Sequence, residues 1–160
     1  MKQTLIGLII LLTTSLSAQS TETFIELLRS DIQASKKVVV AESMELTSEQ
    51  SDKFWPIYNE FQLEVSKLGD KRIAIIKKYA ENYDKFTNEV ANKLMDKSFD
   101  LENDALSLNK KYYKKVKEIL DAKHAGRFIQ LISRMNMLID IQLAAEIPLL
   151  PTTPDSTEVK

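Results

Sequence analysis

The scarcity of glycine most constrains the fold of this chain, whose 160 residues include three glycines, four prolines and no cysteine. Phosphate-binding loops, tight hairpins and dinucleotide-binding turns need glycine where the backbone takes a positive φ or approaches a ligand closely. Chains that are poor in both glycine and proline are typically helical. The length allows one domain whose core needs no disulfides. The composition therefore predicts an all-α fold.

The same composition excludes several classes of function. Without cysteine the chain has no disulfide and no thiolate metal site, and its one histidine cannot form a His-pair site. The balance of 22 basic and 23 acidic residues argues against nucleic-acid binding over the whole surface. The spacings of a phosphate loop and of a nucleophile elbow are absent. We therefore expect no catalytic residues, no cofactor and no enzyme activity.

The first 18 residues have the pattern of a secretory signal peptide. Lys2 precedes an apolar run at 5–12, which is shorter than the roughly 20 residues that a membrane-spanning helix needs. Small residues at 15–18 offer a cleavage site after Ala18 or one residue earlier. The alternative is an uncleaved membrane anchor. Cleavage would release a mature chain that begins at Gln19, which we expect in a periplasm and not inserted in a membrane.

The clearest helix start follows Leu46. Thr47 can act as N-cap, and Gln50 can return a hydrogen bond to the backbone N–H of the cap residue, which together make a capping box. Further on, apolar residues recur every three or four positions, as in a helix that packs against another helix. These residues are Phe54, Tyr58, Phe61, Val65 and Leu68. The pattern predicts a helix that continues to about Asn82 and is kinked at Pro56.

Charge is distributed unevenly along a second long helix, which is predicted at 89–120. Residues 89–104 contain five acidic and two basic side chains, whereas residues 105–118 contain five basic and one acidic. The basic cluster consists of Lys110, Lys111, Lys114, Lys115 and Lys117. With Tyr113 among them, these lysines can attract acidic unfolded chains or anionic lipid heads. The alternative is a solvated helix end, and the predicted export argues against a nucleic-acid partner.

Two shorter helices complete the prediction. An amphipathic helix is expected at 23–34, and residues 36–40 are either its end or the connection that follows. Asp121 can cap the last helix, which ends at Pro148. Its predicted buried side comprises Phe128, Leu131, Ile132, Met135, Leu138 and Ile141. Residues 148–160 are predicted to be a disordered tail, so the folded domain would span 19–147.

Two residues leave more than one interpretation open. Trp55 lies off the apolar stripe of its helix, which suggests that one side packs in the core and another meets a dimer partner or a client. His124 is a possible metal ligand with Asp121 as its nearest acidic neighbour. Zinc sites usually recruit more histidine or cysteine, so a structural or surface role is favoured.

The segment Leu46-Thr47-Ser48-Glu49-Gln50 resembles the Leu-Thr-x-x-Gln motif of the Spy/CpxP family, which comprises small, exported, all-helical periplasmic stress proteins. The family pattern has a second copy of the motif later in the chain. Here Leu120-Asp121-Ala122-Lys123-His124 stands in that place, with Asp121 for threonine and His124 for glutamine. The resemblance covers roughly residues 40 to 140.

The resemblance implies four helices, of which two long antiparallel helices form a curved hairpin within a cradle-shaped dimer. Family members bind unfolded proteins without ATP or damp an envelope-stress sensor kinase. It therefore implies an ATP-independent holdase for unfolded envelope proteins, or alternatively a modulator of a stress-signalling partner. Other relatives bind zinc through His-rich segments, which this chain lacks, although a metal-responsive sensor remains a third interpretation. The candidate client-binding residues are the basic cluster, Trp55 and Tyr113.

Overall fold

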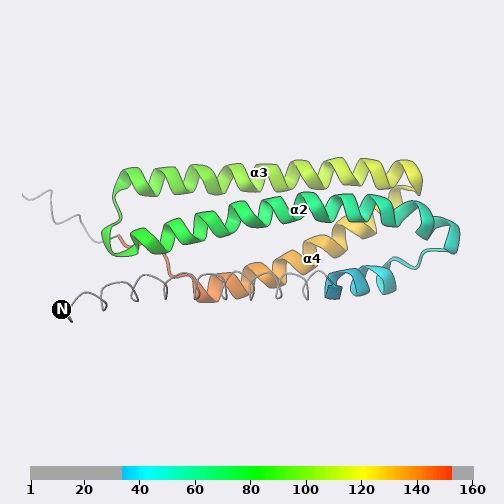
Figure 1. Cartoon of the computed structure of the whole chain (residues 1–160), viewed down its shortest axis with the longest axis horizontal. Coiled ribbons are helices and arrows are strands. Elements are labelled where there is room, and N and C mark those ends of the chain that lie inside the picture. Colours follow the sequence, from blue (N-terminus) through cyan, green and yellow to red (C-terminus); the bar gives the residue numbers. More distant parts are fainter. Residues whose placement is uncertain (1–33, 153–160) are drawn as a thin grey trace, which may run out of the picture. The chain divides into compact units, whose positions relative to one another are not determined.

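The computed structural model describes residues 34–152 (Figure 1), so the predicted signal peptide and nearly all of the predicted helix at 23–34 lie outside the described residues. The chain divides into two units, 1–43 and 44–160. Residues 34–44 are helical, which resolves the ambiguity at 36–40 in favour of helix. This helix ends where Glu45 takes a positive φ of 52°.

As far as residue 152, the second unit contains three long helices and one short turn of 3-10 helix. These are α2 (Ser48–Asn82), η2 (Tyr83–Lys85), α3 (Asn88–Ile119) and α4 (Ala122–Glu146). Residues 34–152 include no strand, which confirms the all-α class. Because the connection between α2 and α3 is short, these helices lie side by side in opposite directions, and α4 packs against α3 (Figure 1). Residues 148–152, at the start of the predicted tail, have no regular secondary structure.

Two of the helix starts are the caps that the sequence predicts. At α2 the backbone N–H of Gln50 donates to Thr47 Oγ1 at 3.3 Å, and the backbone N–H of Thr47 donates to Gln50 Oε1 at 3.0 Å. At α4 the backbone N–H of His124 donates to Asp121 Oδ1 at 2.8 Å. Here the histidine ring bonds the carboxylate of the cap, with Nδ1 2.7 Å from Oδ2, in place of the backbone N–H that glutamine would reach.

Substitution of Thr47 tests directly whether the capping box stabilises the start of α2. Thr47→Ala is expected to lower the free energy of unfolding by about 0.5–2 kcal/mol, because the backbone N–H of Gln50 loses its acceptor, Thr47 Oγ1. Urea denaturation of the mature chain, followed by circular dichroism, measures the difference. Thr152→Ala makes the same chemical change at an exposed position outside the helices and should have no measurable effect. If Thr47→Ala and the parent chain had equal urea denaturation midpoints, the assignment of Thr47 as the N-cap would be contradicted.

The core is built from aromatic side chains where the N-terminal half of α2 meets α3 and α4. The Phe128 ring lies 5.5 Å from the Phe54 ring and 5.3 Å from the Phe61 ring, measured between centroids. Phe61 in turn contacts Tyr112 of α3, with ring centroids 5.1 Å apart. All of these side chains are buried, as the periodicity predicted for Phe54, Phe61 and Phe128, and Val116 of α3 is buried as well.

The second half of α4 differs from the prediction. Leu138 and Ile141, which were expected to be buried, are 65% and 61% exposed. After Met135 the inward side of the helix continues four residues on at Ile139 and then at Leu143, both of which are partly buried. Because positions three and four residues beyond Met135 are both apolar, helical periodicity alone cannot decide which of them faces inward.

Candidate functional site

The basic cluster of α3 divides into two sides. Lys111 and Lys115 point to α2, where Lys111 Nζ lies 2.6 Å from Glu64 Oε1. Lys115 Nζ lies 2.7 and 2.8 Å from the two carboxylate oxygens of Glu60. Hydrogen bonds to these ammonium groups hold the pKa of both carboxyls below the usual range. These two predicted client-binding lysines therefore join α3 to α2.

Tyr112 lies buried between those two ion pairs. Its hydroxyl donates to Glu64 Oε1 at 3.0 Å, and the Nζ atoms of Lys111 and Lys115 lie 5.2 and 5.3 Å from its ring centroid. Burial and then the hydrogen bond to Glu64 raise the pKa of Tyr112 well above its usual value. The phenol thus stays neutral and donates to an ionised carboxylate, which is a strong class of hydrogen bond.

Two buried tyrosines provide a matched comparison. Tyr112→Phe is expected to lower the free energy of unfolding by about 1–3 kcal/mol, because it removes a donor to a charged group. The hydroxyl of Tyr58 is also buried, but it has no hydrogen-bond partner among the described residues. Burial raises the pKa of Tyr58. Tyr58→Phe should therefore leave stability unchanged or raise it slightly, and a larger loss for Tyr58→Phe than for Tyr112→Phe would contradict these assignments.

The other lysines of the cluster face away from α2. Lys110, Lys114 and Lys117 are exposed, and none forms an ion pair within residues 34–152. Tyr113 lies among them and is partly exposed. Since these four residues lie three or four positions apart, they share one side of α3. Trp55 is partly buried, and its ring packs at 5.3 Å on the Tyr58 ring, at the edge of the aromatic core.

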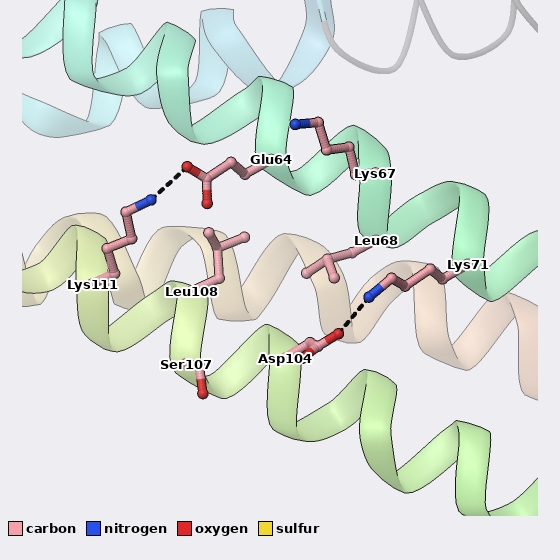
Figure 2. A pocket seen from close by; sticks show the side chains of 8 residues that line it. All are labelled: Glu64, Lys67, Leu68, Lys71, Asp104, Ser107, Leu108 and Lys111. Carbon is pink, nitrogen blue, oxygen red and sulfur yellow. Dashed lines mark hydrogen bonds and ion pairs between the residues drawn. The ribbon is translucent and has the colours of Figure 1, made fainter.

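Between α2 and α3 the surface forms a hollow of about 390 Å³ (Figure 2). Leu68 of α2 and Leu108 of α3 point into it. One end is bounded by the ion pair of Glu64 with Lys111. The other end is bounded by Lys71, whose Nζ lies 2.6 Å from Asp104 Oδ2.

A second hollow of about 500 Å³ continues along the same two helices and shares Lys71 and Asp104 with the first. Its apolar lining comes from Ala74, Ile75 and Leu101. We call the two hollows together the seam groove. Its charged lining residues are Lys67, Lys71, Lys78, Lys97 and Lys111 against Glu64, Asp100 and Asp104. The groove thus combines an apolar floor with rims on which ammonium groups are in excess.

Exposed apolar side chains also lie close together on the second half of α4. Met137 is 61% exposed, comparable with Leu138 and Ile141, and Ala144 and Ala145 are exposed beyond them. We call these five residues the α4 face. They recur one turn apart and therefore lie on one side of the helix. Arg134 is exposed one turn before them, and Asp140 is the one charged residue within 137–145.

The opposite side of the same helix segment is held against α2. Arg72 Nη1 lies 2.6 Å from Asp140 Oδ1, and the Tyr79 hydroxyl donates to the carbonyl oxygen of Pro148 at 2.7 Å. Beneath these bonds, Leu143 and Ile147 line a further hollow with residues of α2 and α3. The second half of α4 is thus apolar on two sides. That double-sided pattern is the signal in the sequence that could have identified the α4 face.

Neither a metal site nor a membrane-spanning helix is found in the part of the chain that the structure describes. Residues 34–152 contain no group of three or more histidine, aspartate or glutamate side chains placed to hold a metal ion. His124 instead contacts its cap residue, Asp121. No helix within these residues combines the length and the apolar character that a membrane crossing needs. In comparisons with known proteins, no family model, curated protein or solved structure matches the chain.

Proposed function

We propose that this chain is an ATP-independent periplasmic holdase, which binds unfolded envelope proteins during stress through the α4 face. The observation that carries the proposal is the row of apolar side chains that α4 presents to solvent, on a helix segment that the ion pair of Asp140 with Arg72 joins to α2. Contiguous exposed apolar surface on a folded protein commonly marks an interaction site. The flexible side chain of Met137 suits contact with many different sequences. The predicted signal peptide would deliver the protein to the envelope.

The outward lysines of α3 support the proposal in a second way. Lys110, Lys114 and Lys117 carry charges that no carboxylate within residues 34–152 neutralises. Unpaired positive charge speeds the encounter with acidic partners, whereas apolar contacts hold them once they are bound. The α4 face thus supplies the holding contacts, and the lysines supply attraction.

Aggregation of a chemically denatured model protein, diluted into buffer without nucleotide and followed by light scattering, tests the proposal. The mature chain from Gln19 should slow aggregation at sub-stoichiometric to equimolar amounts. An unrelated helical protein of similar charge serves as the control. Unchanged aggregation at a several-fold excess of the mature chain would overturn the proposal.

The second candidate is a modulator of one stress-signalling partner. Lys110, Lys114 and Lys117 favour this function as well, because their charges can recognise an acidic sensor domain. Capture of envelope proteins by the mature chain separates the two candidates. Many denatured clients favour the holdase, and one stoichiometric membrane protein favours the modulator. The third candidate, a metal-responsive sensor, predicts calorimetric binding of zinc or copper at micromolar concentration, which the holdase does not require.

We further propose that the protein acts as a homodimer joined along α3. Phe99, Leu106 and Tyr113 follow one another at seven-residue intervals, and the first two are 55% and 52% exposed. Such a row is typical of a helix that packs against another helix. An antiparallel pair centred near Leu106 would also place the basic residues 110–117 of each copy beside the acidic residues 95–102 of the other, so the lysines would attract clients only where the pair leaves them exposed at its edges.

Charge reversal tests this arrangement. The double variant Lys110→Glu/Lys114→Glu should shift the mature chain toward monomer in sedimentation equilibrium, because like charges then meet across the pair. Asp100→Lys/Glu102→Lys should do the same. A mixture of the two variants should associate again, since opposite charges are restored. Dimers that persist in both variants alone would place the contact elsewhere.

A further inference from the structure

We propose that the seam groove is a binding site for a single-chain amphiphile with an anionic head, the chemistry that fatty acids and lysophospholipids share. This inference goes beyond the proposed holdase activity and does not depend on it. The groove lies between α2 and α3, whereas the α4 face lies on a different helix. Occupation of one surface therefore need not block the other.

The shape and the floor of the groove suit an acyl chain. The two adjoining hollows measure about 390 and 500 Å³, within the range of roughly 300–1,000 Å³ that is usual for sites of small organic ligands. Leucines 68 and 108 line the first hollow, and Ala74, Ile75 and Leu101 line the second. A chain laid along α2 and α3 would thus contact apolar side chains in both hollows. The aliphatic stems of the rim lysines extend that apolar surface from the floor of the groove toward its opening.

The charges on the rims suit an anionic head. Five lysines line the groove against three carboxylates, and two of the carboxylates already have an ammonium partner within 2.6 Å. Lys97 forms no ion pair within residues 34–152. Lys78 has only a 3.5 Å contact with Glu81, in which both side chains are 63% exposed. We therefore place the head near Lys78 and Lys97, where Asp100 is the one facing carboxylate on the rim.

The ion pair of Lys71 with Asp104 lies at the boundary of the two hollows, so an acyl chain must pass beneath it or displace it. Both side chains are largely exposed, at 60% and 48%. Exposed ion pairs contribute little to stability, and the aliphatic stem of Lys71 can cover an apolar chain while its ammonium stays in water. The pair therefore does not prevent binding.

Isothermal titration calorimetry of the mature chain with laurate, below the micelle concentration, tests the site. Saturable binding of one laurate per chain is expected. Acetate has the same head without the chain, and dodecyl maltoside has the same chain with an uncharged head. Both should bind at least about tenfold more weakly than laurate, because each lacks one of the two kinds of contact.

Two variants locate the binding. Ile75→Gln should weaken laurate binding at least about tenfold, as should Lys78→Glu/Lys97→Glu, because the first changes the floor and the second reverses the rim charge. Leu63→Gln changes an exposed leucine of α2 that does not line the groove, and it should leave binding unchanged. Circular dichroism checks that every variant is folded. Absence of laurate binding, equal binding of dodecyl maltoside, or equal affinity in all three variants would overturn the proposal.

Discussion

Replacement of Phe128 by alanine is expected to lower the free energy of unfolding of the mature chain by about 3–5 kcal/mol, the largest stability change that we predict. This ring is fully buried and contacts Phe54, Tyr58 and Phe61, so it fills the space where α4 meets α2. Alanine would leave a cavity that those rings can close only in part. Urea denaturation followed by circular dichroism measures the loss.

Leu138→Ala provides the matched control on the same helix. Because Leu138 is 65% exposed, its truncation should change the free energy of unfolding by no more than about 0.5 kcal/mol. Phe128→Leu keeps most of the volume and should stay folded if Phe128→Ala does not, with an intermediate loss of stability. Similar losses for Leu138→Ala and Phe128→Ala would show that the orientation of α4 described above is wrong.

The second large effect concerns activity. The double variant Leu138→Gln/Ile141→Gln should need at least about tenfold more protein than the parent chain to halve the aggregation of a denatured client. Burial of a leucine or isoleucine against a partner contributes about 1.5–3 kcal/mol, and about 1.4 kcal/mol corresponds to a tenfold change in affinity. The thermal midpoint should stay close to that of the parent, because neither side chain is in the core. Light scattering and a thermal melt measure the two properties on the same sample.

Leu63→Gln is the control for that experiment. Leu63 is 68% exposed on α2, so the substitution removes about as much accessible apolar surface as either single change on α4, but away from the α4 face. It should leave the protective activity unchanged. If Leu63→Gln and the double variant lost the same amount of protective activity, the result would indicate that clients bind exposed apolar residues over the whole surface and not the α4 face.

Features that depend on a few neighbouring residues could be predicted from the sequence. Thr47 and Gln50 form their capping box within a single turn, and Asp121 caps α4 through the next residues along the chain. The buried aromatic stripe of α2 follows from helical spacing, because the side chains involved are large and recur every three or four positions. In these cases the local energetics and the tertiary packing favour the same structure.

Features that depend on which helix lies opposite could not be predicted. Lys111 and Lys115 pair with Glu64 and Glu60 because the antiparallel register of α2 and α3 brings them together, and nothing local separates them from Lys114. The seam groove depends on that same register. For the second half of α4, the sequence shows apolar residues on two sides of the helix and thus one exposed apolar side. Which of the two sides faces inward depends on contacts with other helices, so the residues of the α4 face could not be predicted.

The central claim is that unfolded clients bind the α4 face, and the methionines of the mature chain report on it directly. Met137 belongs to the face and is 61% exposed, whereas Met44 is 1% exposed. In carbon-13 methyl spectra of methionine-labelled protein, assigned with Met→Leu variants, a soluble and permanently unfolded client should shift or broaden the Met137 signal and leave the Met44 signal unchanged. An unchanged Met137 signal at client concentrations that saturate the protective activity would contradict the account.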